Sequence, residues 1–179
     1  MRFVLSPHSD SDGSSVRRIE VKARRPSPLQ LRLKYEIAGE IDALRVPPLA
    51  KPARADELWR TTCLEAFVQI DGEAGYFEFN FAPSRQWAAY VFDAYRADMH
   101  AVEIEPPRIE VQSGAARLAL AVSVDLPPSA AHADWRLGVT AVIEDVKGEK
   151  TYWALAHPPG KPDFHHPIGF AGRLAAEHT

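Results

Sequence analysis

A period of two in the alternation of apolar and polar residues is the feature that most constrains the fold of this chain. Residues Leu29 to Ile37 read LQLRLKYEI, with five apolar side chains on one side and four polar or charged ones on the other. Residues 117–124 and 135–143 repeat the pattern. This period is typical of strands with one face on a core and one in water. The sequence therefore predicts β-structure, with a short turn near residues 54–59 as its best helical candidate.

Turn signals divide the remaining apolar segments into hairpins. Residues 62–70 and 76–81 flank the loop DGEAG, residues 87–95 follow as a third central strand, and the turn 144–149 precedes residues 150–156. Most of the 15 prolines lie between these segments, as expected for loops and strand starts. The pattern predicts an all-β fold, an antiparallel β-sandwich of the jelly-roll kind. We expect one domain over residues 15–179, preceded by a flexible amino-terminal arm over residues 1–14.

Composition excludes several classes of protein. Apolar residues make up 46% and charged residues 25% of 179 residues, which is ordinary for a globular domain and excludes a disordered or fibrous chain. A net charge of −3 argues against a dedicated nucleic-acid binder. The single cysteine, Cys63, excludes an intramolecular disulfide. No segment has the apolar run of a membrane span or a signal peptide. We expect a cytoplasmic protein without nucleic-acid or membrane partners.

Polar and aromatic residues are interleaved in residues 58–95. Parity puts three phenylalanines on one face of residues 76–81, whereas Glu78 and Asn80 share the other face. Glu65 on the preceding strand lies near them if the polar faces of the hairpin coincide. Two interpretations stay open: a solvated sheet face, or the polar floor of a concave ligand site with Trp59 as a wall. The second fits sugar recognition, because a pyranose stacks on an indole ring and its hydroxyls need donors and acceptors.

A loop rich in proline, residues 156–167, is the second candidate binding element. It carries His157, His165 and His166 together with polar and aromatic side chains. Prolines leave such a loop less entropy to lose on binding, although it could also be a plain connection. A zinc site is disfavoured because the adjacent His165 and His166 diverge on an extended backbone. We therefore expect no metal.

Catalytic alternatives find little support in the sequence. Glu65 and Glu78 could form the acid and nucleophile of a glycosidase, but nothing in the sequence indicates a raised pKa or a deep cleft. Ser84 lacks the G-x-S-x-G surroundings of a nucleophile elbow, and no glycine loop for phosphate is present. Cys63 fits a small core residue. The sequence predicts a protein that is not an enzyme and has no cofactor.

The residues then resemble the DOMON-like superfamily, which includes the family 9 carbohydrate-binding modules, over about residues 15–174. The resemblance is carried by Trp59, by Glu65–Asp71 and by Phe77–Asn80, in the order and spacing of the modules. Four later segments follow the same plan: Gly138–Asp145, Tyr152–Trp153, Pro162–His165 and Phe170–Leu174.

The resemblance implies a non-catalytic domain that binds a carbohydrate or a similar polyhydroxylated metabolite. It implies that a sugar ring stacks on Trp59 and that Glu65 and Asn80 bind sugar hydroxyls. Glu78 stands where the modules carry a ligand-binding arginine, and Phe164 or His165 stands near the place of a second tryptophan. The expected ligand-binding set is Trp59, Arg60, Glu65, Glu78, Asn80, Arg96, Lys161, Asp163, Phe164 and His165.

Two other functions stay open. Some DOMON domains bind haem through a methionine and a histidine, and Met99-His100 follows the third central strand. A haem-binding or redox domain is therefore one alternative, and a structural or protein-interaction sandwich is another.

Charge at the candidate site gives a further expectation. Glu65 and Glu78 within about 5–6 Å of each other would raise the pKa of at least one carboxyl, unless a cation lies between them. Arg60, Arg85, Arg96 and Lys161 are available, and we expect Arg96 or Arg60 within salt-bridge distance of one carboxylate. Alternatively, the two carboxylates face opposite sides of the sheet.

Overall fold

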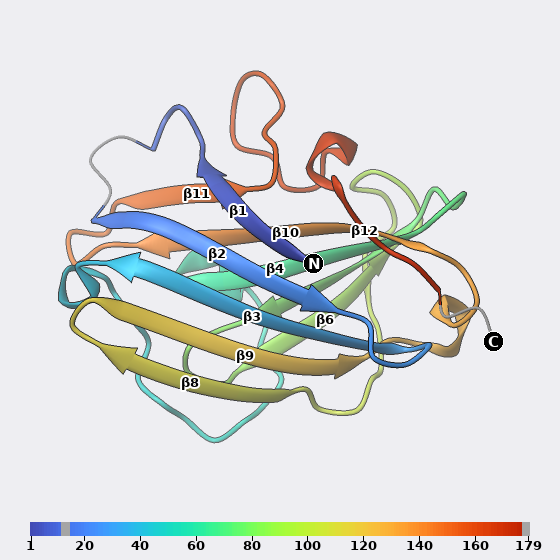
Figure 1. The fold of residues 1–179 in the computed structure, drawn as a ribbon, viewed down its shortest axis with the longest axis horizontal. Coiled ribbons are helices and arrows are strands. Elements are labelled where there is room, and N and C mark those ends of the chain that lie inside the picture. Colours follow the sequence, from blue (N-terminus) through green and yellow to red (C-terminus); the bar gives the residue numbers. More distant parts are fainter. Residues whose placement is uncertain (12–14, 177–179) are drawn as a thin grey trace.

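The computed structural model describes residues 1–11 and 15–176 as two layers of antiparallel strands (Figure 1). The front layer contains β1 (Arg2–Pro7), β2 (Val16–Arg24), β3 (Gln30–Gly39), β8 (Arg108–Gly114) and β9 (Arg117–Asp125). The back layer contains β4 (Cys63–Ile70), β5 (Tyr76–Phe81), β6 (Trp87–Phe92), β7 (His100–Ala101), β10 (Trp135–Glu144), β11 (Lys150–Ala154) and β12 (Gly172–Leu174). Short 3-10 turns are η1 (Ile41–Ala43), η2 (Leu58–Arg60), η3 (Pro128–Ala130) and η4 (Pro167–Gly169). Within these ranges no helix has the length and hydropathy to cross a membrane.

Hydrogen bonding links the two layers into one curled sheet. The order along the sheet is β7-β6-β5-β4-β10-β11-β1-β2-β3-β9-β8, and β12 pairs with β10. Strand β1 makes the connection, because Arg2–Leu5 pair with β2 while Ser6 and Pro7 pair with β11. The predicted antiparallel β-sandwich is confirmed.

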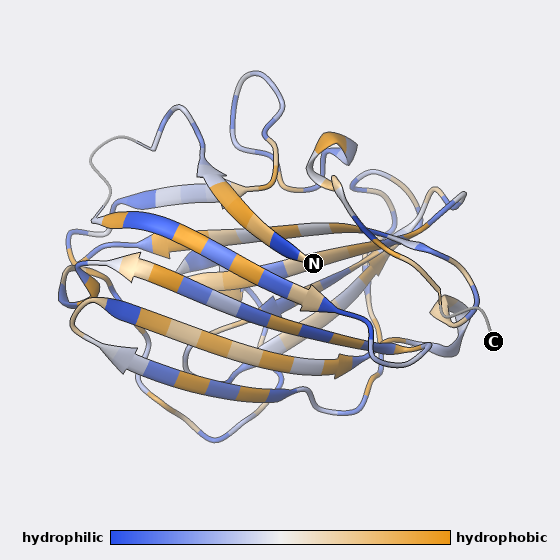
Figure 2. Ribbon diagram, viewed as in Figure 1, coloured by the Kyte–Doolittle hydropathy of each residue, from blue (hydrophilic) through white to orange (hydrophobic). Residues whose placement is uncertain are grey.

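The front layer follows the alternation in the sequence. Along β3, Leu31, Leu33, Tyr35 and Ile37 are buried, while the side chains between them are more exposed. Figure 2 shows the same alternation of hydrophobic and hydrophilic residues on β2 and β8, whereas β9 is hydrophobic along most of its length. Strands β2, β3 and β8 therefore have one face on the core and one in water, which the sequence predicts for β3.

The central strands of the back layer are buried on both faces. Phe77, Phe79 and Phe81 of β5 face the core between the layers. The opposite face is covered by a second apolar cluster, which contains Phe67, Tyr76, Ala88, Tyr90, Phe92 and Phe170. Loops from both ends of the sheet close over this outer face, so it is not a solvated sheet face.

The expected flexible arm at residues 1–14 is wrong for residues 2–7, which form β1. The sequence shows only a short apolar run there, and the pairing that orders it comes from the following strand β2 and from β11, which is distant in the chain. Leu5 is 2% exposed and packs in the main core, whereas the neighbouring Val4 is 49% exposed. Residues 12–14 of the predicted arm lie outside the described residues.

The substitution Leu5→Ala tests whether β1 is part of the fold. We expect it to lower the free energy of unfolding by about 2–4 kcal/mol, because it removes a buried side chain and leaves a cavity. The matched control Val4→Ala should change it by about 1 kcal/mol or less. Urea unfolding of both variants makes the comparison, and equal, small effects would contradict the assignment of β1.

Candidate functional site

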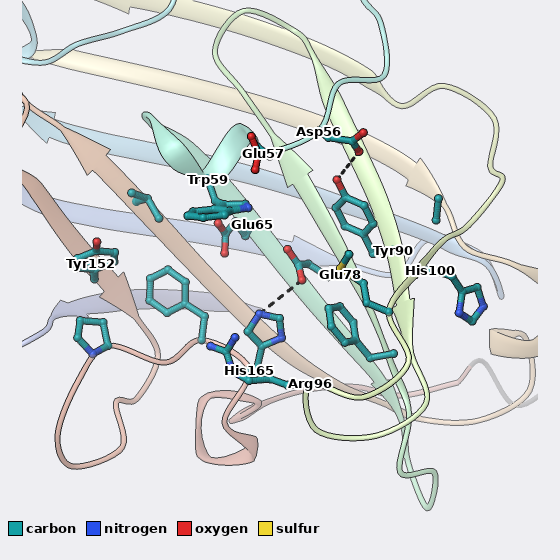
Figure 3. A pocket seen from close by; sticks show the side chains of 16 residues that line it. Asp56, Glu57, Trp59, Glu65, Glu78, Tyr90, Arg96, His100, Tyr152 and His165 are labelled. Atoms are coloured by element: carbon teal, nitrogen blue, oxygen red, sulfur yellow. Dashed lines mark hydrogen bonds and ion pairs between the residues drawn. The ribbon is translucent and has the colours of Figure 1, made fainter.

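A cavity of about 810 Å³ lies on the outer face of the back layer (Figure 3). Strands β4, β5 and β6 form its floor, and loops that precede η2, follow β6 and follow β11 form its walls. Its lining residues are Asp56, Glu57, Trp59, Glu65, Glu78, Tyr90, Phe92, Arg96, Met99, His100, Ala101, Val142, Tyr152, Pro162, Phe164 and His165.

Two carboxyl groups form the polar part of the floor. Glu65 is 3% exposed and Glu78 is 6% exposed. The register of β4 and β5 pairs Glu65 with Asn80, so Glu78 lies diagonally across from Glu65 on the same face. Thr140 Oγ1 donates to Glu65 Oε2 at 3.1 Å, and Asn80 Nδ2 donates to Glu78 Oε1 at 2.8 Å. The polar faces of the hairpin therefore coincide, which the sequence alone left open.

Burial makes both carboxyl groups hard to ionise. Burial first, and then the charge of Glu78, raises the pKa of Glu65 to about 8. Burial also raises the pKa of Glu78, although the hydrogen bond from Asn80 and the charge of Arg96 oppose that shift. Near neutral pH the pair therefore retains a proton at Glu65.

His165 joins the loop after β11 to the floor. Its Nδ1 is hydrogen-bonded with the Tyr76 hydroxyl at 2.8 Å, and its Nε2 lies 3.7 Å from Glu78 Oε2. The ring packs against Phe67 and Phe92. Burial, with the charge of Arg96 as a smaller cause, lowers the pKa of His165 to about 4. The imidazole is therefore neutral at pH 7 and does not neutralise Glu78.

Aromatic side chains form the walls. Trp59 projects from η2, which begins after Glu57 in a left-handed conformation (φ 58°), and its side chain remains 48% exposed. On β6, the Tyr90 hydroxyl donates to Asp56 Oδ1 at 2.6 Å. Phe164 packs edge-on against Tyr152 with ring centroids 6.0 Å apart. The guanidinium of Arg60 lies 5.4 Å from the centre of the Trp59 ring, and the half-exposed indole can offer a ring face to a ligand above the acidic floor.

The expectation that Arg96 or Arg60 forms an ion pair with a floor carboxylate is wrong. Arg96 instead binds Asp163, with Nη2 to Oδ1 at 2.7 Å, and Arg60 binds Glu57 at 2.8 Å. Among residues 1–11 and 15–176, no lysine or arginine nitrogen lies within 4.0 Å of either floor carboxylate. The sequence could not show this outcome, because Asp163 reaches Arg96 only through the long loop after β11.

The structure brings together six of the ten expected ligand-binding residues as cavity lining: Trp59, Glu65, Glu78, Arg96, Phe164 and His165. Asn80 and Asp163 instead support lining residues, Glu78 and Arg96 respectively. Arg60 and Lys161 are exposed and do not line the cavity.

Several lining residues were missed by sequence reasoning. Parity along residues 87–92 puts Tyr90 and Phe92 on the face of Ala88, opposite Trp87, and this signal could have found them. Asp56, His100 and Tyr152 carry no comparable local signal, since loops and distant pairing place them in the cavity.

The cavity residues do not fit the haem alternative. Both ring nitrogens of His165 face protein oxygens, of Tyr76 and Glu78. Met99 and His100 are neighbours in the chain, so they cannot approach one iron from opposite faces of a haem. Within the described ranges no group of three or more histidine, cysteine or acidic side chains could hold a metal ion.

The fold is similar to that of solved carbohydrate-binding proteins. A protein from Bacteroides uniformis ATCC 8492, described as a candidate carbohydrate-binding protein, has a TM-score of 0.72 at 14% identity, covering 99% of this chain and 86% of its own. Two structures of family 9 carbohydrate-binding modules from Caldicellulosiruptor kristjanssonii, in complex with glucose and with cellotriose, have TM-scores of 0.54 and 0.59 at 9% and 8% identity. They cover 94% and 100% of this chain and 81% and 83% of the modules.

The chain has the β-sandwich fold of these proteins. No protein-family model and no curated protein matches it. Membership of the DOMON-like superfamily therefore stays a prediction, and the fold is what the likeness shows.

The raised pKa of Glu65 predicts how stability depends on pH. Below the ordinary carboxyl pKa of about 4.3 the folded and unfolded states are both protonated, so Glu65 causes no pH dependence. Between there and about 8 only the unfolded state releases the proton, so the free energy of unfolding falls as pH rises, by up to about 1.4 kcal/mol per pH unit.

The variant Glu65→Gln should flatten this fall, and Glu110→Gln, an exposed carboxylate on β8 paired with Arg108, should keep it. Urea unfolding from about pH 5 to 8 gives both profiles. Parallel profiles for wild type and Glu65→Gln would contradict a raised pKa at Glu65.

Proposed function

We propose that this protein is a non-catalytic carbohydrate-binding domain whose site is the cavity above β4–β6. The single observation that carries the proposal is the placement of the half-exposed Trp59 and the buried carboxyl groups of Glu65 and Glu78 around one cavity. Similarity to proteins whose names describe carbohydrate binding supports it.

The chemistry of the lining matches a sugar ring. The apolar C–H face of a pyranose stacks on the indole of Trp59, and its hydroxyls bind the oxygens of the floor. Protonated Glu65 donates a hydrogen bond and the second carboxyl oxygen of Glu78 accepts one, so the floor can pair with both sides of a hydroxyl. A cavity of about 810 Å³ is within the usual range for small-ligand sites.

A binding role is favoured over glycoside hydrolysis. A glycosidase needs one carboxyl group on either side of the scissile bond. Here Glu65 and Glu78 lie on adjacent strands of one floor, on the same side of the cavity. This arrangement presents both groups to one face of a ligand.

Isothermal titration calorimetry with glucose, cellotriose and other mono- and oligosaccharides tests the proposal. We expect dissociation constants of about 10–100 μM, since only one ring is held against one indole wall. Folded protein that binds none of the sugars would contradict the proposal.

The variant Trp59→Ala isolates the stacking wall. We expect sugar binding to weaken about tenfold or more, because the buried face of an indole contributes on the order of 1–3 kcal/mol. The free energy of unfolding should change little, since the side chain is 48% exposed.

Val146→Ala, at a similarly exposed apolar side chain on the turn after β10, is the matched control and should leave affinity unchanged. Calorimetry and urea unfolding of both variants complete the comparison. Equal affinity for wild type and Trp59→Ala would remove Trp59 from the site.

A further inference from the structure

The cavity carries more acidic than basic side chains, and its basic groups are already neutralised. Asp56, Glu57, Glu65 and Glu78 line it, against the single guanidinium of Arg96, which is paired with Asp163. Glu57 is paired with Arg60, and Glu65 retains its proton near neutral pH because its pKa is raised. Asp56 and Glu78 are the two remaining lining acids, and they have no lysine or arginine partner in the described chain. His165 adds no positive charge, because burial keeps its imidazole neutral at pH 7. The space above the floor is therefore a negatively charged environment without a free cation among the described lining residues.

Two carboxyl oxygens of the floor have no hydrogen-bond donor in the described part of the chain. Thr140 donates a hydrogen bond to Glu65 Oε2, and Asn80 donates one to Glu78 Oε1. The oxygens that receive no hydrogen bond from a described residue are Glu65 Oε1 and Glu78 Oε2. The nearest basic nitrogen to Glu78 Oε2 is His165 Nε2 at 3.7 Å, too far for a hydrogen bond. Both residues are more than nine-tenths buried and line the cavity. Glu78 Oε2 can therefore accept a hydrogen bond from a ligand, and Glu65 Oε1 can do so once the Glu65 carboxyl group has lost its proton.

The aromatic side chains in the walls of the cavity also attract a positively charged ligand. Trp59, Tyr90, Phe92 and Phe164 contribute aromatic rings to the cavity. The negative face of an aromatic ring attracts a cation within about 6 Å, and more strongly where water is excluded. An ammonium group has three donors and no acceptor, which matches carboxylate oxygens that only accept.

We propose that the ligand is an amino sugar, a hexose or oligosaccharide that carries a positively charged amino group, with its ammonium bound between the carboxyl groups of Glu65 and Glu78. This inference rests on the carbohydrate-binding function proposed above. The sugar ring stacks on Trp59, and the ammonium supplies the positive charge that the described residues do not place at the floor.

Binding of the ammonium displaces the proton that the carboxyl pair retains. Before binding, Glu65 is protonated because burial and Glu78 raise its pKa to about 8. The ammonium stabilises the ionised form of both carboxyl groups, so the proton leaves Glu65 for the buffer. Release should approach one proton per amino sugar at pH ~6.5, where an amino group with a pKa of about 7.7–8 stays charged.

Other titratable groups surround the pair and define the pH range. Tyr76 and Tyr90 have raised pKa values, through burial in each case, and stay neutral over this range. Burial raises the pKa of the Cys63 thiol beside Glu65. Arg96 stays charged and Asp163, whose pKa is lowered, stays ionised as its partner. Tyr35, behind β4, donates to the Glu65 backbone carbonyl and has a raised pKa through burial. Glu65 and Glu78 are therefore the groups whose ionisation the ligand changes.

Calorimetry with glucosamine, glucose and N-acetylglucosamine tests the inference, because the three share a ring and differ in charge. Titrations at pH ~6.5 in buffers of different ionisation enthalpy give the number of protons released. We expect glucosamine to bind about tenfold or more tightly than the two neutral sugars and to be the one that releases protons. Between about pH 5 and 7 its affinity should rise, because a proton is displaced less readily at low pH.

Two variants test whether the preference for glucosamine and the release of protons depend on the carboxyl groups of the floor. Glu78→Gln should bring the ratio of glucosamine to glucose affinity to within about threefold of one, and proton release should fall. The control Glu110→Gln, on the outer face of the front layer, should keep both. Circular dichroism confirms that each variant is folded.

The outcomes separate the two proposals. Equal binding of all three sugars without proton release overturns the amino-sugar inference and leaves carbohydrate binding in place. If no sugar binds to folded protein, both proposals fail. Choline added as a fourth probe identifies a site for organic cations in general, and binding of choline without glucosamine would also overturn both.

Discussion

Burial of both faces of β4, β5 and β6 is the constraint on which the rest of the molecule depends. The inner face contributes phenylalanines to the core, and this packing fixes the register in which Glu65 lies opposite Asn80. A one-residue slip would turn the carboxyl groups into the core and the phenylalanines outward. The main core therefore keeps two ionisable groups on the outer face, where they line the cavity and are almost fully buried.

The front layer and the site are physically connected. The Tyr35 hydroxyl on β3 donates to the backbone carbonyl of Glu65 at 2.6 Å, across the core. A buried hydroxyl without an acceptor would cost on the order of 1–3 kcal/mol, so this bond ties β3 to β4 across the core. On the other side, His165 and the ion pair of Arg96 with Asp163 anchor the loop after β11. Packing in the core thus fixes the strands of the cavity floor, whereas polar contacts fix the loop after β11 that forms one of its walls.

Sequence reasoning could predict what depends on local alternation. It found β3 and β9 of the front layer and β4, β5, β6, β10 and β11 of the back layer, and it put Glu78 and Asn80 on one face, because period-two parity determines which side chains share a face. It did not single out β2 or β8. It failed where distant segments decide the outcome. Strand β1 pairs with the distant β11 as well as with the neighbouring β2, and Arg96 forms an ion pair with Asp163 of the loop after β11. The carboxyl pair consequently has no arginine or lysine beside it in the described chain, which the sequence could not show.

The central claim is that the cavity above β4–β6 is a carbohydrate site. A crystal structure of the protein with cellotriose tests it most directly. The account predicts a sugar ring stacked on Trp59, with hydroxyl oxygens within about 3 Å of the carboxyl groups of Glu65 and Glu78. Cellotriose bound at another surface, with neither Trp59 nor the two carboxyl groups in contact with it, would contradict the account.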